Sequence, residues 1–219
     1  MRSDHSHGMK LVILGRDGTI NRYRDDHVKS IDELEPLPGA LEAVARLNHA
    51  GWHTVMATNQ PGIGRGLLDM ASLNAVHMRL AQLLAEKGGR LDAAFFCPHT
   101  PEEGCTCRKP LPGLIRQVGE RFGVDLSTVH MVGASLKDVQ TAQAAGCVPH
   151  LVQGDRLGVM NELQLAELQT QVPDVRIHTD LGAFADYLIQ EDRRRAKAEA
   201  RAAQESAAPA SSGSDFVAE

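Results

Sequence analysis

Aromatic side chains make up only 4% of this 219-residue sequence, so leucine, valine, isoleucine and alanine must supply the core. Long apolar runs are absent too, and no stretch approaches the roughly 20 residues that span a bilayer. The polar start MRSDHSHG lacks the apolar region of a secretory signal. A basic excess is also missing, since the formal net charge is −5, and nucleic-acid phosphates demand a basic face. These absences predict a cytoplasmic protein, expected to be a monomer, with neither a nucleic-acid nor a membrane partner.

Composition divides the chain into three parts. Residues 1–8 are polar and are expected to form a flexible leader, and residues 9–192 have the length of one globular domain. Residues 193–219 carry almost no large apolar side chain. Their Ala/Arg/Glu-rich first part favours a helical extension, whereas the Ala/Pro/Ser/Gly stretch after Ser206 predicts a disordered tail.

Short apolar runs alternate with helical patterns between residues 11 and 152. We predict strands at 11–14, 52–58, 91–96, 129–132 and 147–152. We predict helices at 38–51, 71–87, 112–123 and 135–146. This alternation is typical of an α/β fold with a doubly wound parallel sheet covered on both faces. Ligands of such folds bind at the carboxyl ends of the strands, so functional residues should follow the strands directly.

The loops after the first four predicted strands are rich in glycine and hydrogen-bond donors. In order they are GRDGTIN (15–21), TNQPGIGRG (58–66), CPH (97–99) with CTCRKP (105–110), and GASLKD (133–138). Hydroxyls, backbone amides, arginine and lysine converge in this way on one edge of the sheet. Such a composition suits a phosphate oxyanion.

Three of the four cysteines fall within eleven residues of the chain. Cys97, His99, Cys105 and Cys107 provide three thiolates and one imidazole, the ligand set of a closed tetrahedral zinc site with no open position for catalysis. A chance cluster or a disulfide pair are the alternatives, and a disulfide is disfavoured in a cytosolic protein. We therefore expect a structural zinc that holds the loop carrying residues 108–109.

Taken together, these motifs resemble the haloacid dehalogenase superfamily of phosphatases and, with the zinc loop and TNQPGIGRG, its D-glycero-D-manno-heptose 1,7-bisphosphate phosphatase family. The resemblance covers about Lys10 to Val152. It implies a Rossmannoid domain with a zinc-binding loop, no large cap domain and a Mg²⁺ cofactor. The implied reaction removes the 7-phosphate of the heptose bisphosphate during lipopolysaccharide precursor synthesis. Histidinol-phosphate phosphatase has a similar zinc loop and remains an alternative.

The family mechanism assigns roles to particular positions. An aspartate after the first strand attacks phosphorus, and a second aspartate two residues later protonates the leaving alcohol. The resemblance therefore implies an acid/base at Asp17, phosphate clamps at Thr58 and Lys109, and substrate-orienting side chains at Asn59 and Arg108.

Two positions depart from the family pattern. Gly15 stands where the family has its nucleophile, and Ala134 stands where it has the first carboxylate after the fourth strand. Asp17 and Asp138 are the acidic magnesium positions that remain. Loss of a covalent nucleophile costs on the order of 10⁶ in kcat, and loss of carboxylate ligands weakens Mg²⁺ binding severely. The sequence predicts a phosphatase scaffold without turnover by the family mechanism.

Other functions stay open at this point. The pocket keeps Lys109 and Arg108, so phosphate or a sugar phosphate is expected to bind without Mg²⁺ and remain uncleaved. The chain would then be a sugar-phosphate binding or regulatory protein. A third hypothesis is residual hydrolysis through Asp17 or a metal hydroxide. Arg16 and Arg65, taken singly, favour solvated side chains, although the glycine-rich loop around Arg65 equally suits a grip on substrate.

Overall fold

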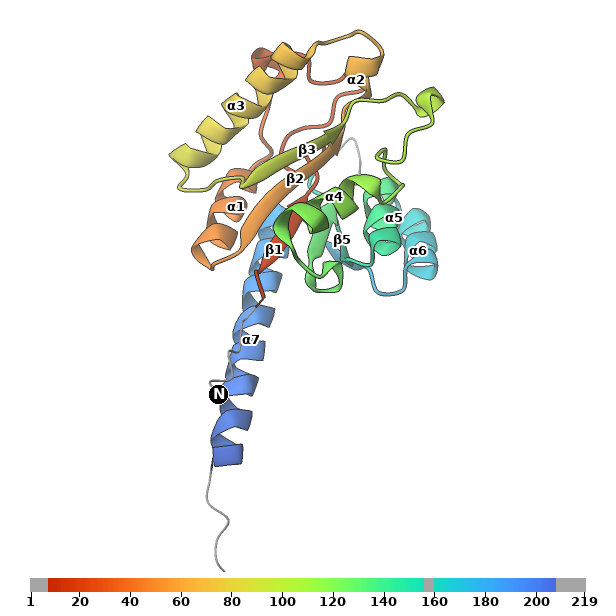
Figure 1. Ribbon diagram of the computed structural model, residues 1–219. Coiled ribbons are helices and arrows are strands. Elements are labelled where there is room, and N and C mark those ends of the chain that lie inside the picture. Colours follow the sequence, from red (N-terminus) through yellow and green to blue (C-terminus); the bar gives the residue numbers. More distant parts are fainter. Residues whose placement is uncertain (1–7, 156–159, 208–219) are drawn as a thin grey trace, which may run out of the picture. The chain divides into compact units, whose positions relative to one another are not determined.

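The computed structural model describes residues 8–155 and 160–207 (Figure 1). The chain divides into two compact units, residues 1–185 and 186–219, and the first contains all the strands of the described residues. Most of the expected leader and the end of the expected tail, residues 1–7 and 208–219, lie outside the described residues.

Six parallel strands form one sheet in the order β3-β2-β1-β4-β5-β6. They are β1 (Leu11–Leu14), β2 (His53–Asn59), β3 (Ala93–Cys97), β4 (His130–Gly133), β5 (Val148–Val152) and β6 (Arg176–His178). The chain builds outward from β1 in one direction to β3 and then outward from β4 in the other. The carboxyl ends of β1 and β4 therefore flank the point where the strand order reverses, which is where such sheets bind ligands.

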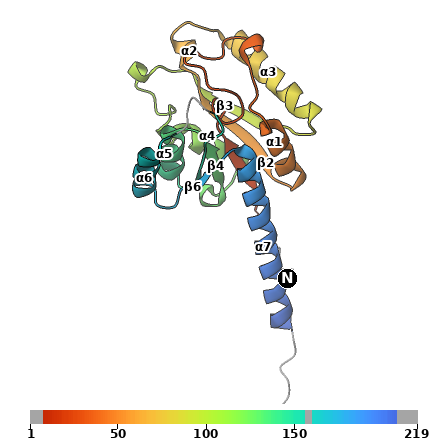
Figure 2. The same ribbon diagram turned by 180° about the vertical axis from the view of Figure 1, so that it is seen from behind.

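Helices connect the strands, and a last helix follows β6. They are α1 (Ala40–His49), α2 (Pro61–Gly64), α3 (Met70–Glu86), α4 (Gly113–Phe122), α5 (Leu136–Ala145), α6 (Glu162–Gln171) and α7 (Leu181–Ala207), with short 3₁₀ turns at Ile31–Glu33, Pro101–Glu103 and Leu126–Thr128. Right-handed crossovers place α1 and α3 on one face of the sheet and α4 and α5 on the other (Figures 1 and 2). None of the described helices combines the length and the apolarity needed to cross a bilayer.

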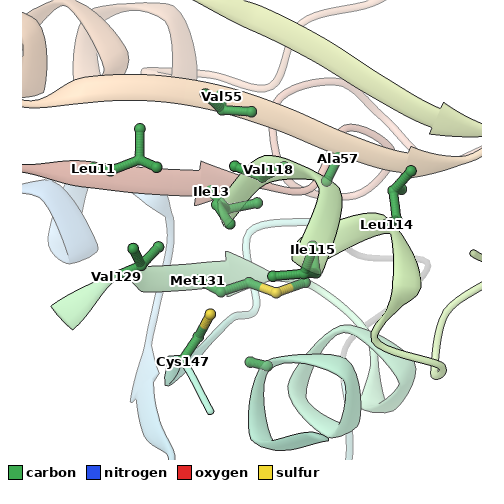
Figure 3. Close-up of a cluster of buried hydrophobic side chains, with 11 residues drawn as sticks. Leu11, Ile13, Val55, Ala57, Leu114, Ile115, Val118, Val129, Met131 and Cys147 are labelled. Atoms are coloured by element: carbon green, nitrogen blue, oxygen red, sulfur yellow. The ribbon is translucent and has the colours of Figure 1, made fainter. Parts of the chain in front are cut away.

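The core lies on both faces of the central strand β1, whose four residues are all fully buried. On one face, alternate residues of β1, β2 and β4 meet α4 and α5 (Figure 3). This cluster contains Leu11, Ile13, Val55, Ala57, Leu114, Ile115, Val118, Val129, Met131, Ala142 and Cys147. Aliphatic packing of this kind replaces the aromatic core that the composition lacks, and it fixes the strand ends that carry the polar loops.

The fold class predicted from the sequence is confirmed, and all five predicted strands are present with ends shifted by no more than two residues. The sixth strand, β6, was not predicted, because its three residues Arg176–His178 form no apolar run. The helix α6 was missed as well. Only one of its residues, Leu168, is buried, so its apolar pattern is weak.

Candidate functional site

The loop after β1 winds around one carbonyl oxygen. The backbone N–H groups of Thr19, Ile20 and Asn21 all donate to the carbonyl of Arg16, at 3.2, 2.8 and 3.2 Å. This tight path requires a left-handed residue, and Gly18 takes a φ of +79°. The turn aims the side chain of Asp17 and of Asn21 toward each other at the carboxyl end of the sheet.

Asp17 is held by three donors. One carboxylate oxygen accepts hydrogen bonds from Arg16 Nη2 at 3.0 Å and from Asn21 Nδ2 at 3.1 Å, and the other accepts from Gln60 Nε2 at 2.9 Å. Burial by itself would raise the pKa of Asp17. The charge of Arg16 and the three side-chain hydrogen bonds outweigh burial and hold the pKa of this carboxyl below its ordinary value of 3.8. Asp17 is therefore ionised at neutral pH.

Arg16 is buried, with 1% of its surface exposed, so the expectation of a solvated side chain is wrong. Besides Asp17, its guanidinium contacts Gln60 Oε1 at 3.3 Å and His77 Nε2 at 3.2 Å. Burial, together with the charge of Arg16, lowers the pKa of His77 to about 4, so this imidazole is a neutral partner at neutral pH. A buried arginine needs such a complete set of partners, and a single sequence does not display them.

The loop after β2 contributes Thr58 and Asn59. The Asn59 side chain donates to the Lys109 carbonyl at 3.1 Å and accepts from the Lys109 backbone N–H at 3.0 Å, so it fixes that residue by its backbone. The Thr58 hydroxyl is buried and accepts a hydrogen bond from Gln60 Nε2 at 2.9 Å. Gln60 was not selected from the sequence, yet it links Thr58, Arg16 and Asp17.

Lys109 and Asp138 form a buried ion pair. Lys109 Nζ lies 2.5 Å from one Asp138 oxygen and 3.0 Å from the Ala57 carbonyl. The second Asp138 oxygen accepts from the Ser135 hydroxyl at 2.8 Å and from the backbone N–H groups of Ala134 and Ser135 at 3.1 Å each. Burial would raise the pKa of Asp138, and the Lys109 charge lowers it overall. Lys109, which the resemblance assigns as a phosphate clamp, therefore has its charge paired with Asp138 in this structure.

Gly15 lies at the end of β1, where its backbone N–H donates to the Val132 carbonyl of β4 at 2.9 Å. It is not among the glycines with positive φ, so the backbone would accept a residue with a side chain. A Cβ atom placed there would lie 2.9 Å from Thr19 Oγ1 and 3.5 Å from Gly133 Cα. Gly15 therefore does not occupy a turn that requires the conformational freedom of glycine. Ala134 is half-buried, and a Cβ atom placed at Gly18 would lie 3.1 Å from the Ala134 Cβ.

The two carboxylates at this edge, Asp17 and Asp138, are both engaged by donors of the protein itself. Mg²⁺ takes an octahedral set of oxygen ligands, whereas both oxygens of Asp17 and both of Asp138 already accept hydrogen bonds, and each carboxylate pairs with a buried cation. Gly15 and Ala134 add no ligand. Among the described residues, the only group of three or more His, Cys, Asp or Glu that could converge on a metal ion is in the cysteine loop.

The cysteine loop brings its four predicted ligands together. Cys97 at the end of β3, His99, Cys105 and Cys107 place their ligand atoms within 4.8 Å of one another. The shortest separations are 3.0 Å between the sulfurs of Cys97 and Cys107 and 3.3 Å between His99 Nδ1 and Cys107 Sγ. A tetrahedron with Zn–S bonds of about 2.3 Å has edges of about 3.7 Å. The donor set and its compact arrangement fit a zinc ion.

Two arginines lie near this loop. Arg108 is half-buried and donates to the His99 carbonyl at 3.2 Å, whereas Arg65 is exposed and contacts His27 Nε2 at 3.4 Å. The pKa of Glu102 is lowered by hydrogen bonds from its own backbone and Thr100, and further by the charges of Arg65 and Arg108. The two guanidinium groups therefore share one neighbourhood.

The fold and the site define a class of protein. The chain belongs to the haloacid dehalogenase-like hydrolases, a family that matches residues 6–146. Within this class it is 50% identical, over 184 residues, to the D-glycero-beta-D-manno-heptose-1,7-bisphosphate 7-phosphatase of Bordetella bronchiseptica, covering 84% of this chain and 99% of that enzyme. The enzyme of the same name from Pseudomonas aeruginosa is 47% identical and covers 82% of this chain and 98% of its own.

Solved structures agree with this relationship. The crystal structure of D,D-heptose 1,7-bisphosphate phosphatase from B. bronchiseptica, complexed with magnesium and phosphate, superposes with a TM-score of 0.76 at 48% identity, covering 84% of this chain and 99% of that one. The Burkholderia thailandensis enzyme superposes with a TM-score of 0.60 at 42% identity, over 82% and 98% of the two chains. The family resemblance inferred from the motifs is confirmed.

Proposed function

We propose that this chain is the scaffold of a heptose-bisphosphate phosphatase that binds a sugar phosphate or inorganic phosphate without hydrolysing it by the family mechanism. The ligand proposed is D-glycero-D-manno-heptose 1,7-bisphosphate, with the 7-phosphate at the edge formed by β1 and β4. The relatives named above support this choice over histidinol phosphate. A cytoplasmic location and a monomeric state stay predictions.

The observation that carries the proposal is the end of β1. Gly15 occupies the position from which the family nucleophile attacks, and it has no side chain that could form an aspartyl-phosphate. Asp17 does not replace it, since its carboxylate is tied to Arg16, Asn21 and Gln60. An attacking oxygen would have to leave its own donors, which are Arg16 and Asn21 for one oxygen and Gln60 for the other.

Asp17 is also a poor proton donor in this chain. A general acid must carry a proton at the operating pH, and the contacts with Arg16 lower the pKa of Asp17. At neutral pH its carboxylate accepts hydrogen bonds and repels the phosphate. The remaining task of Asp17 is to hold Arg16 and Gln60 in place.

Phosphate binding rests on the groups that stay available. Arg65 lies in the loop that follows β2 and Arg108 in the loop that follows β3, and the backbone N–H groups of the glycine-rich loops supply further donors. The pairs Lys109–Asp138 and Arg16–Asp17 carry no net charge. Without magnesium in the carboxylate site, binding of the anion therefore depends on Arg65 and Arg108 more than on Lys109.

Phosphate release measures the proposal directly. We expect no Mg²⁺-dependent release from heptose bisphosphate by this chain, and we expect the double variant Gly15→Asp/Ala134→Asp to release phosphate at least about 10⁴-fold faster, because it regains the nucleophile and a metal ligand. The matched control is Gly15→Asn/Ala134→Asn, which has nearly the same shape without the carboxylates. Mg²⁺-dependent turnover by the unchanged chain at the rate of the double variant would refute the proposal.

Ligand binding is measured separately by calorimetry in EDTA. Heptose bisphosphate, histidinol phosphate and inorganic phosphate are titrated into the unchanged chain and into Arg108→Ala. We expect heat from heptose bisphosphate with the unchanged chain and weaker binding to the variant. No heat at millimolar ligand would remove the binding function.

A further inference from the structure

The hydroxyl of Thr19 is buried and has no hydrogen-bond partner among the described residues. Thr19 is 1% exposed, and its backbone N–H is already bound to the Arg16 carbonyl. Nearly all buried polar groups in native proteins have a partner, and each exception calls for an explanation. The orphaned hydroxyl belongs to the loop that follows β1.

The position of the Thr19 hydroxyl, next to Gly15, explains why it has no partner. A Cβ atom at Gly15 would lie 2.9 Å from Thr19 Oγ1 and 3.6 Å from Thr19 Cβ. A small rotation of the Thr19 side chain makes room for that atom, and the oxygens of an aspartate would then come within reach of the hydroxyl. A hydroxyl that donates to a carboxylate forms a short and strong bond of about 2.5–2.7 Å.

We infer that Thr19 is a positioning residue for a carboxylate at position 15, and that its hydroxyl is left without a partner in this chain because that position is glycine. The inference rests on the proposed function, since it gives position 15 the role of the nucleophile. The hydroxyl would orient one carboxylate oxygen and leave the other free to attack phosphorus.

A competing explanation is a water molecule. Thr19 also lines a cavity of about 220 Å³ together with Pro38, Val152 and Asp180, and water in that cavity could hydrogen-bond to the hydroxyl. In that case the residue at position 15 would have no influence on Thr19. The two explanations therefore differ in whether positions 15 and 19 are coupled.

Thermal unfolding of four chains measures the coupling: the unchanged protein, Thr19→Val, Gly15→Asp and the double variant. In the unchanged background, we expect Thr19→Val to raise Tm by roughly 2–4 °C, because it removes an unsatisfied buried hydroxyl. In the Gly15→Asp background, the same change should lower Tm by a similar amount. An equal shift in both backgrounds would overturn the inference and favour the cavity water.

Thr54→Val is the matched control. Thr54 is fully buried at the other end of the sheet, and its hydroxyl bonds to the Arg90 carbonyl at 2.6 Å and to Asn48 Nδ2 at 3.1 Å. Its loss should lower Tm equally with and without Gly15→Asp. Unequal shifts at this site would mean that Gly15→Asp changes the whole domain, and the coupling at Thr19 would then count against the inference.

Kinetics separate positioning from a merely structural role. In the Gly15→Asp/Ala134→Asp background, Thr19→Val should lower kcat about 10-fold while KM for heptose bisphosphate changes less than about twofold. Thr19→Ser, which keeps the hydroxyl, should restore kcat. If that background has no activity at all, the proposed function fails, while the unfolding measurements still decide the role of Thr19. A change in KM alone would contradict the inference.

Discussion

The cysteine loop and the carboxyl edge of β1 and β4 lie next to each other in the chain fold but differ in how complete they are. The loop has all four ligands of a zinc site, from Cys97 to Cys107, within 4.8 Å. At the edge, the proposed function places Gly15 and Ala134 where the family has carboxylates, and the charged side chains Arg16, Asp17, Lys109 and Asp138 form two ion pairs. Under the proposed function, a zinc site that only holds the backbone in place is complete, whereas the site of the reaction is not.

Lys109 joins the two regions. It follows Cys107 by two residues, its backbone is clamped by Asn59, and its ammonium pairs with Asp138. The cysteine loop therefore positions Lys109, whose charge is neutralised by the buried carboxylate of Asp138. The comparison predicts that damage to the loop or to the ion pair lowers stability. If the proposed function holds, neither change alters the rate of phosphate release.

Zinc removal gives the largest expected effect on stability. A metal present at about 1,000 times its Kd stabilises the folded state by about 4 kcal/mol, so we expect chelation to lower Tm by roughly 10 °C. Cys105→Ser should show the same loss and reduce the zinc content from one ion per chain, measured by elemental analysis.

The matched control for this prediction is Cys147→Ala. Cys147 is buried in the core cluster, outside the loop, so the variant should keep one zinc ion per chain. If Cys105→Ser kept its full zinc content, or if chelation left Tm unchanged, the cysteine loop would not be a stabilising zinc site.

Breaking the ion pair at the edge gives the next largest effect. Lys109→Met leaves Asp138 buried without a counter-charge, and we expect the free energy of unfolding to fall by about 3–5 kcal/mol. The control is Lys137→Met, which changes an exposed lysine on the same helix as Asp138. It should lower the free energy of unfolding by less than about 0.5 kcal/mol. The measurement is urea unfolding of both variants.

Lys109→Met/Asp138→Asn sharpens this result, because it removes both charges, keeps a side-chain oxygen for the Ala134 and Ser135 donors, and should recover most of the lost stability. If Lys109→Met lowers the free energy of unfolding no more than Lys137→Met does, the pair with Asp138 does not neutralise Lys109. The charge of Lys109 would then be available to a phosphate.

The sequence was most informative where a residue type determines the chemistry. Spacing and ligand type were enough to predict the cysteine loop, and apolar runs were enough to predict the five longer strands. Partner choice was not predictable: Arg16 is buried by Gln60 and His77, which lie in other loops and helices, and Lys109 is neutralised by Asp138 across the sheet edge. Such pairs depend on distances between loops, and no local pattern encodes them.

Three histidines form another polar cluster, outside both the cysteine loop and the carboxyl edge of β1 and β4, and its stability can be measured against theirs. His130 Nδ1 lies 2.9 Å from His150 Nε2, and His150 Nδ1 lies 3.1 Å from His178 Nε2, so the three rings form a row across β4, β5 and β6. His150 is 1% exposed. Burial, with smaller contributions from the charges of His130, His178 and Arg176, lowers its pKa from 6.5 to about 2.

This row gives the smallest predicted effect, and the sign follows from the direction of the pKa shift. Below pH 6.5 the unfolded chain binds a proton at His150 that the folded chain does not, so stability falls as the pH falls. Between pH 6.5 and 5 the free energy of unfolding falls by about 2 kcal/mol.

His150→Gln should remove that part of the pH dependence in urea unfolding, whereas His49→Gln, at an exposed site, should keep it. Zinc content measured at each pH separates this loss from acid release of the metal by the loop. An unchanged pH slope in His150→Gln would assign the acid sensitivity to the loop or the edge instead.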